Sequence, residues 1–167
     1  MEATASHKLK EIFGSHPSLS EHERHDVANQ LQATLVDLID LSLVGKQLHW
    51  NVTGTHFRSL HLMLDELIDS WRLAADVVAE RVSALGLAPD GRAATVAADS
   101  EIKVVHDGPI KDTEVVSLLT EQLAVAIAKI NERRERVGEI DPQSEDVLIG
   151  VARDLEENHW MIAAQQV

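Results

Sequence analysis

Apolar residues recur every three or four positions along most of this 167-residue chain, which places them on one face of a helix. A capping box, Ser20 with Glu23, precedes the first such segment and predicts a helix from about Ser20 to Asn51. After a turn over residues 52–55, the same spacing predicts a second helix, which Gly86 and Pro89 end. The apolar or small positions of these two faces are Val27, Leu31, Thr34, Leu38, Leu41, Gly45 and Leu48, then Phe57, Leu60, Leu64, Leu67, Trp71, Ala74 and Val78.

Residues 87–112 are mixed in character and contain Pro89, Gly91, Gly108 and Pro109, which predicts a connection that carries one short helix. A third long helix is expected from near Asp112 to Gly138, and a fourth after Asp141-Pro142, which supply an N-cap and a first-turn proline. Four long helices with one extended link predict an all-α four-helix bundle. Residues 20–167 would form this domain and residues 1–19 an N-terminal tail.

A second apolar stripe lies off the main helix faces, where a monomeric bundle would carry polar residues. It has two interpretations, a wider core or burial against other subunits. Its members are Val36, Ile39, Leu43, Ile68 and Ala75.

Composition narrows the class of protein. Apolar residues make up 44% of the chain, which argues against disorder, and the absence of cysteine excludes disulfides, thiolate metal sites and thiol catalysis. No apolar run approaches the ~20 residues that span a bilayer, and the N-terminus lacks a signal-peptide pattern. A cytoplasmic protein without membrane contact is expected.

Histidines and carboxylates gather near the end of the first helix and along the second. His61 and Asp65 are spaced i,i+4, as are Asp76 and Glu80, and His49 lies at the nearby helix end. Two imidazoles with three carboxylates suit Fe(II) and similar divalent metals, including Zn(II). The alternative is that these are ordinary polar residues on a solvated helix face.

One chain cannot bring all five side chains together. His61 and Asp76 are 15 residues apart, or about 22 Å along a straight helix. Two copies of the second helix, crossing antiparallel near Ser70 and Trp71, would set His61 and Asp65 of one chain against Asp76 and Glu80 of the other. Such an isologous contact creates two equivalent sites. The spacing disfavours a bundle enzyme with an intrachain metal site.

At these residues the chain resembles the Dps family, the mini-ferritins that protect DNA during starvation. The resemblance lies in Lys46-x-x-His49-Trp50-Asn51, Gly54, Phe57 and Leu60-His61-x-x-x-Asp65-Glu66-Leu67. It continues through Asp76-x-x-x-Glu80-Arg81 and Ala84-Leu85-Gly86, and more weakly at Arg153-Asp154-Leu155 and Trp160.

The resemblance implies a ferritin-like bundle that assembles into a hollow homo-dodecamer with ferroxidase centres at two-fold interfaces. His49, His61 and Asp65 would come from one subunit and Asp76 and Glu80 from its neighbour, holding a di-iron or mono-iron centre in which zinc or another divalent metal can substitute. The family oxidises Fe(II), usually with hydrogen peroxide in preference to dioxygen. It stores ferric mineral in the shell, which protects against oxidative damage.

Further candidate residues surround this set. The resemblance suggests that Trp50 donates an electron and quenches oxidants; the alternative is an aromatic residue packed at an interface. Lys46 could tune the site electrostatically; the alternative is an ordinary surface lysine. The resemblance also implies that acidic residues at the start of the last helix line a three-fold iron-entry pore, which makes Asp141, Glu145 and Asp146 pore candidates. The alternative for these residues is helix capping. His7, His16, His22 and His25 are expected to be solvated rather than to form a second metal site.

The net charge of the chain indicates whether it can bind DNA. Fifteen Lys and Arg against 28 Asp and Glu give −13 per chain, so DNA binding, which needs cations against phosphates, is expected to be weak or absent. The alternative function is a nucleoid-binding structural shell whose metal sites mainly stabilise the assembly. In that case the cytoplasmic protein would be associated with the nucleoid.

Overall fold

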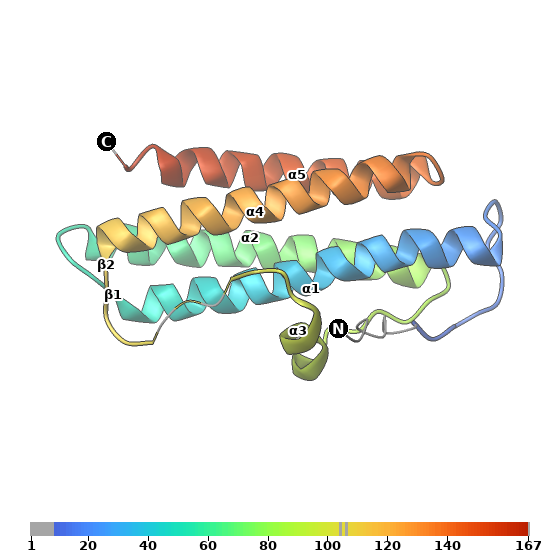
Figure 1. The fold of residues 1–167 in the computed structure, drawn as a ribbon, viewed down its shortest axis with the longest axis horizontal. Helices are drawn as coiled ribbons and strands as arrows, with labels where there is room; N and C mark the ends of the chain where they lie inside the picture. The colour runs from blue at the N-terminus through green and yellow to red at the C-terminus, as the bar shows by residue number, and fades with distance from the viewer. Residues whose placement is uncertain (1–8, 104, 106, 167) are drawn as a thin grey trace, which may run out of the picture.

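The computed structural model describes residues 9–103, 105 and 107–166. Within these residues four long helices form the bundle: α1 (Glu21–Asn51), α2 (Phe57–Ala84), α4 (Asp112–Gly138) and α5 (Pro142–Ala163). α1 packs against α2 and α4 against α5 as two antiparallel pairs (Figure 1). The all-α four-helix prediction is confirmed.

The connection between α2 and α4 runs back along the bundle, because these two helices point in the same direction (Figure 1). It carries the predicted short helix, α3 (Ala93–Asp99), beside α1. It ends in β2 (Ile110–Lys111), which pairs in parallel with β1 (Val52–Thr53). The sequence did not predict this pair, because two residues per strand are too few to leave an alternating pattern.

The capping box at the start of α1 forms as predicted. The Ser20 hydroxyl accepts from the Glu23 backbone N–H at 3.3 Å, and the Glu23 carboxylate accepts from the Ser20 backbone N–H at 2.8 Å. Both bonds satisfy donors at the helix entrance and explain why α1 begins at Glu21.

Trp71 lies in the core of the protomer. Its indole N–H donates to Asn158 Oδ1 at 2.8 Å and so links α2 to α5. α1 approaches closely at Gly45, where an added Cβ would lie 2.7 Å from Trp71 Cζ3. Trp71 therefore requires a glycine on the facing helix.

Part of the second apolar stripe belongs to the core, and part of it is left exposed on the protomer. Val36, Ile68 and Ala75 are buried within the protomer and widen its core. Leu43 is 56% exposed, and Ile39 is half-buried. Only the outer part of the stripe is thus left for another molecule to cover.

A charged network fixes the crossover to the bundle. The Asp37 carboxylate on α1 pairs with Arg133 of α4 at 2.7 Å and accepts from the Glu101 backbone N–H at 2.9 Å. The Glu101 carboxylate pairs with Lys129 at 2.6 Å, and this hydrogen bond is the main reason that its pKa is lowered. The crossover is thereby held to both α1 and α4.

The N-terminal segment lies on the bundle where it is described. Leu9 is buried, Ile12 N–H donates to Gly86 O at 2.8 Å, and Ala88 N–H donates to Lys10 O at 2.8 Å. Residues 1–8, which include His7, lie outside the described residues. Residues 9–12 of the predicted N-terminal tail therefore contact the bundle.

None of the helices in the described residues combines the length and the apolar character that crossing a bilayer requires.

Candidate metal centre

The turn between α1 and α2 brings the first two candidate ligands together. It contains Gly54 at φ 129°, where an added Cβ would lie 2.5 Å from the Asp112 carboxylate. That carboxylate accepts from the His56 backbone N–H at 2.8 Å, a bond that is the main cause of its lowered pKa. Glycine's freedom at positive φ and the anchoring by Asp112 fix the turn, and with it the approach of the two helix ends.

His49 and His61 bind one another's backbone. His49 Nδ1 lies 2.8 Å from His61 O, His61 Nδ1 lies 3.0 Å from His49 O, and the two rings stack with centroids 3.7 Å apart. The carbonyl of His49 is in the last turn of α1, where carbonyls lack a helical partner. The histidine pair therefore closes the end of α1 and orients both rings.

These bonds determine which ring nitrogen can bind a metal. A carbonyl oxygen only accepts, so Nδ1 of each neutral imidazole carries the proton. Nε2 then keeps its lone pair, as in metal sites where a histidine donates its other N–H to a carbonyl. The negative end of the α1 dipole adds attraction for a cation at the same place.

Asp65 completes a three-residue group one turn along α2. The ligand atoms of His49, His61 and Asp65 all lie within 4.8 Å of one another. Asp65 Oδ1 lies 3.5 Å from His49 Nδ1 and forms an ion pair with Lys46 Nζ, which is the main cause of the lowered pKa of Asp65. The predicted set from one subunit is thus gathered in one place, with Lys46 as its neighbour.

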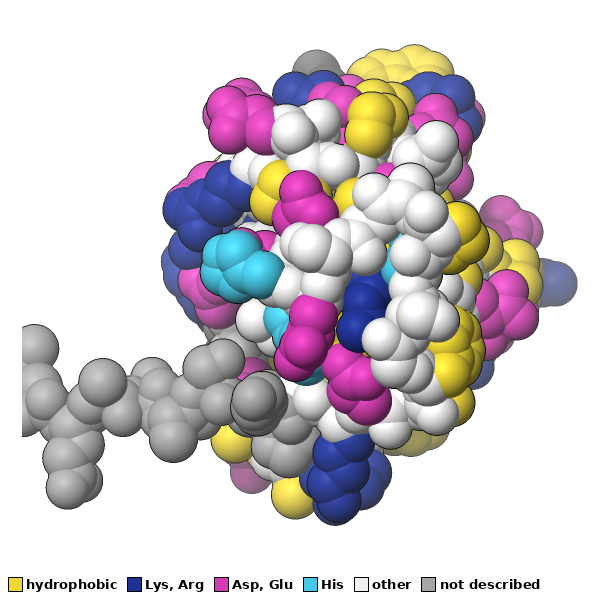
Figure 2. All heavy atoms as spheres, turned by 90° about the vertical axis from the view of Figure 1, so that its right-hand side faces the viewer, with side chains coloured by type: hydrophobic (Ala, Val, Ile, Leu, Met, Phe, Trp, Pro, Cys, Tyr) yellow, Lys and Arg dark blue, Asp and Glu magenta, His cyan; other side chains and the backbone are white. Residues whose placement is uncertain are grey.

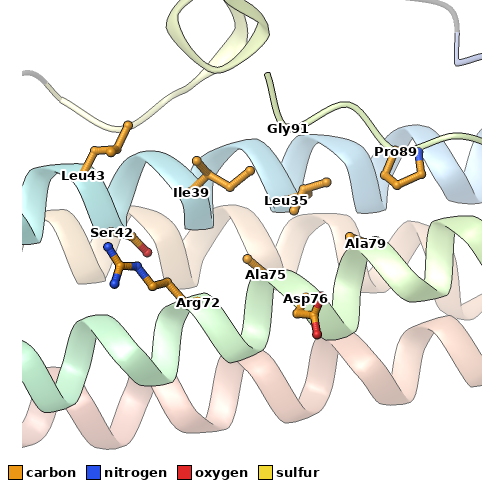
Figure 3. Close-up of a pocket in the computed structure, with 10 residues that line it drawn as sticks. All are labelled: Leu35, Ile39, Ser42, Leu43, Arg72, Ala75, Asp76, Ala79, Pro89 and Gly91. Carbon is orange, nitrogen blue, oxygen red and sulfur yellow. The ribbon is translucent and has the colours of Figure 1, made fainter. Parts of the chain in front are cut away.

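Asp76 and Glu80 lie apart from this group. They are exposed residues farther along the same unbroken helix, and neither contributes to the three-residue group. Asp76 borders an open groove of about 370 Å³ between α1 and α2, drawn in Figure 3. The groove walls are mainly apolar: Leu35, Ile39 and Leu43 on α1, Ala75 and Ala79 on α2, and Pro89 beyond it.

Trp50 follows His49 directly and is 69% exposed. The protomer leaves this indole largely uncovered beside the histidine pair.

The three pore candidates differ in their surroundings. Asp141 is buried, and its carboxylate accepts from Arg81 at 2.6 Å and from the Ser144 hydroxyl at 2.5 Å. Burial opposes its ionisation, yet these hydrogen bonds keep the pKa of Asp141 below its usual value. Glu145 is half-buried and Asp146 is exposed, at the end of the bundle that Figure 2 faces, where acidic side chains are visible among neutral and basic ones. The geometry gives Asp141 a structural partner, whereas Asp146 is open to solvent.

Sequence reasoning missed two interactions. Arg81, noted only as part of the resemblance, joins α2 to the start of α5 through Asp141. A second group, Glu11, Glu21 and His25, also has its ligand atoms within 4.8 Å of one another. The i,i+4 spacing of Glu21 and His25 was an available signal, but the position of Glu11 depends on the tertiary fold.

Comparison with known proteins agrees with this architecture. A ferritin-like domain family matches residues 28–167. The chain is 32% identical over 148 residues to DNA protection during starvation protein 2 of Deinococcus radiodurans, with 89% of this chain covered. It spans 61% of that relative's length. It is 34% identical over 151 residues to DNA protection during starvation protein of Mycolicibacterium smegmatis, covering 89% of this chain and 81% of that protein.

Solved structures give the same result. A tetragonal form of Mycobacterium smegmatis Dps superposes with a TM-score of 0.87 at 31% identity, covering 90% of this chain and 92% of that one. Sequence and structure therefore agree over nearly the whole bundle, and the chain belongs to the Dps family of ferritin-like proteins.

Proposed function

We propose that this protein is a ferroxidase and iron-storage subunit, which oxidises Fe(II) at centres shared between two subunits and retains ferric mineral inside a shell of twelve. The observation that carries the proposal is the orientation of His49 and His61. Their Nδ1 atoms lie within hydrogen-bond distance of backbone carbonyls, which leaves both Nε2 lone pairs for a metal, and Asp65 belongs to the same three-residue group.

The ligand types fit Fe(II) as the substrate. Imidazole nitrogens and carboxylate oxygens bind Fe(II), and the residues hold it where an oxidant can reach it. Two Fe(II) ions each give one electron to one hydrogen peroxide molecule, whose O–O bond breaks, and two protons complete two water molecules. This reaction consumes both reagents from which hydroxyl radicals form, and in this way it would protect DNA and other cell components.

A second copy of the chain would supply Asp76 and Glu80. Both residues are exposed, and the groove beside Asp76 has mainly apolar walls that water otherwise covers. Antiparallel packing of α2 on its copy would cover that groove and bring these carboxylates to the three-residue group of the partner. Because the contact is isologous, each dimer would hold two centres.

Lys46 and Trp50 have supporting roles in this proposal. The Lys46 ammonium neutralises Asp65 before a metal arrives and competes with a bound metal for the negative charge of that carboxylate. Trp50, exposed beside His49, would pack at the subunit interface and donate an electron to an oxidant that escapes reduction by Fe(II).

The decisive experiment mixes two inactive variants. His61→Ala and Glu80→Ala should each abolish rapid Fe(II) oxidation, because each removes one ligand from every shared centre. When the two variants are refolded together, a mixed dimer contains one centre that lacks both ligands and one intact centre. Random pairing makes half the dimers mixed, so about a quarter of the wild-type activity should return.

The controls separate loss of ligands from loss of folding. His22→Ala and Glu132→Ala remove the same side-chain types from the surface, where His22 pairs with Asp26 and Glu132 with Arg136, and they should oxidise iron normally. Mass spectrometry must show that the two variants occur in the same shell. If mixed shells stay at the single-variant rate, the shared centre is refuted.

A second candidate is a shell that coats DNA, which the names of the two relatives favour. Coating requires cations against phosphates, and the chain carries a net charge of −13. We therefore infer that the protein protects DNA by consuming Fe(II) and hydrogen peroxide and not by coating it. The assembled protein should leave duplex DNA unretarded in a gel at physiological salt, and retardation there would favour the coating function.

A further inference from the structure

A buried arginine holds the N-terminal segment against the start of α1. The Arg24 side chain is 1% exposed, and its Nη1 donates to Leu85 O at 3.1 Å. Its Nη2 donates to Glu11 Oε1 at 3.0 Å and lies 3.4 Å from Gly14 O. Arg24 thus positions the Glu11 carboxylate beside the first turns of α1.

Three side chains meet at this place. Glu21 and His25 lie one turn apart on the same face of α1, and Glu11 approaches them from the N-terminal segment. Histidine and acidic side chains are visible on this end of the bundle in Figure 2. The group lies far from the candidate ferroxidase ligands, since His25 and His49 are 24 residues apart on α1, or about 36 Å.

The separation within the group suits a metal better than a hydrogen bond. His25 Nε2 lies 3.5 Å from Glu11 Oε1, which is beyond the usual N–H···O range of about 2.7–3.2 Å. In a tetrahedral zinc site, ligand bonds of about 2.1 Å place neighbouring ligand atoms about 3.4 Å apart. The two atoms are therefore already spaced as two ligands of one ion.

The charges also suit a divalent cation. Glu11 and Glu21 bring two negative charges, Arg24 compensates one of them, and neutral His25 adds a nitrogen ligand. A carboxylate oxygen has two lone pairs, so Glu11 Oε1 can keep its bond to Arg24 while it binds an ion. Nitrogen with carboxylate oxygen is a ligand set used for zinc and other first-row divalent ions.

We propose that Glu11, Glu21 and His25 bind a divalent transition-metal ion that cross-links the N-terminal segment to α1. The ion adds a bond between two parts of the chain that Arg24 already holds together. Because the site draws only on residues at the start of the chain, it is independent of iron oxidation at the other end of α1.

Zinc binding by the assembled full-length protein tests the site. Equilibrium dialysis at neutral pH should show that His25→Asn binds one Zn²⁺ per chain fewer than wild type. His22→Asn is the matched control: His22 is 86% exposed, pairs with Asp26 at 3.2 Å and does not belong to the group, so this variant should bind as wild type does. Equal zinc content in wild type and His25→Asn would overturn the proposal.

A second measurement reports on the cross-link itself. Lys10 is exposed beside Glu11, so trypsin can cleave after it, and Zn²⁺ should slow that cleavage at least tenfold in wild type and His22→Asn. In His25→Asn, zinc should have no effect on the rate. Similar zinc-free rates in all three proteins would show that the substitution leaves the segment in place. Equal protection of wild type and His25→Asn, or none in wild type, would contradict the cross-link.

Iron oxidation separates this site from the ferroxidase centre. His25→Asn should oxidise Fe(II) at the wild-type rate, while His61→Ala should lose oxidation and keep the zinc-dependent protection after Lys10. If His61→Ala abolished that protection as well, zinc would be acting through the other centre and the proposal would fail.

Discussion

Lys46 Nζ and His49 Nδ1 both approach the same atom, Oδ1 of Asp65. A cationic side chain from α1 therefore lies against the carboxylate that would bind the first metal ion on α2. Lys46 neutralises the Asp65 carboxylate within the protomer, so a metal ion bound there would have to compete with this lysine.

Replacing the lysine tests that competition. Lys46→Met should strengthen Zn²⁺ binding at the His49, His61 and Asp65 group about thirtyfold, because one unit charge at about 4 Å in a solvated site opposes a divalent cation by about 2 kcal/mol. Lys46→Arg keeps the charge and should bind as wild type does. Competition with a chromogenic chelator measures both, and weaker binding by Lys46→Met would show that the lysine supports the metal.

The protein is expected to assemble into a shell of twelve chains. Twelve chains of 18.4 kDa give a shell of about 220 kDa, which native mass spectrometry can measure directly. Assembly should cover the groove beside Asp76, so Leu43→Asp, which puts a charge on its wall, should lower the yield of shells. A monomer that persists at micromolar concentration would contradict the shared centre, whereas a dimer would keep the centre and remove the storage cavity.

The ion pair between Arg81 and Asp141 should matter for stability and for acid sensitivity. Asp141→Asn leaves Arg81 without its charged partner and should cost about 2–4 kcal/mol at neutral pH. The pKa of Asp141 is lowered in the folded protein, so its ionised form stabilises the fold above its usual pKa of about 3.9, and this contribution is lost as the pH falls below that value. Thermal midpoints of the two proteins should therefore differ at pH 7 and approach one another as the pH falls from about 4 through the lowered pKa of Asp141. Equal midpoints at pH 7 would refute the stabilising role.

Iron entry should depend on the other two acidic residues. Replacing Glu145 with Gln and Asp146 with Asn removes negative charge from the end of the bundle, and an acidic funnel raises the local concentration of cations. The double variant should take up Fe(II) several-fold more slowly at low ionic strength, with an intact shell and a nearly unchanged thermal midpoint. Unchanged uptake under those conditions would place the entry route elsewhere.

Two helical glycines should respond oppositely to alanine. At Gly45 the new Cβ would meet Trp71 and Ile68 at 2.7 and 2.8 Å, so Gly45→Ala should destabilise the protein by about 1–3 kcal/mol. At Gly150 an added Cβ would meet no described atom within 4 Å apart from its chain neighbours and the local backbone of α5, so Gly150→Ala should stabilise α5 by up to about 1 kcal/mol. Thermal or urea unfolding measures both changes. A large loss at Gly150 would show that another subunit approaches that face of α5.

The sequence by itself determined the helices, the short helix of the crossover and the metal-ligand candidates. These features depend on local spacing: capping at Ser20, apolar periodicity, the Asp141-Pro142 start of α5, and the i,i+4 pairs on α2. The separation of 15 residues between His61 and Asp76 also showed, from helix geometry alone, that one chain cannot bring all the candidate ligands together.

Only the tertiary structure decided which side chains meet across the bundle. The pairing of Asp141 with Arg81, the reciprocal bonds of His49 and His61, and the approach of Glu11 to His25 join residues that no local pattern relates. The same holds for the outer stripe: Val36 and Leu43 have similar apolar character in the sequence, yet one is buried and the other exposed. Periodicity specifies the face on which a residue lies, but what covers that face depends on how the helices pack.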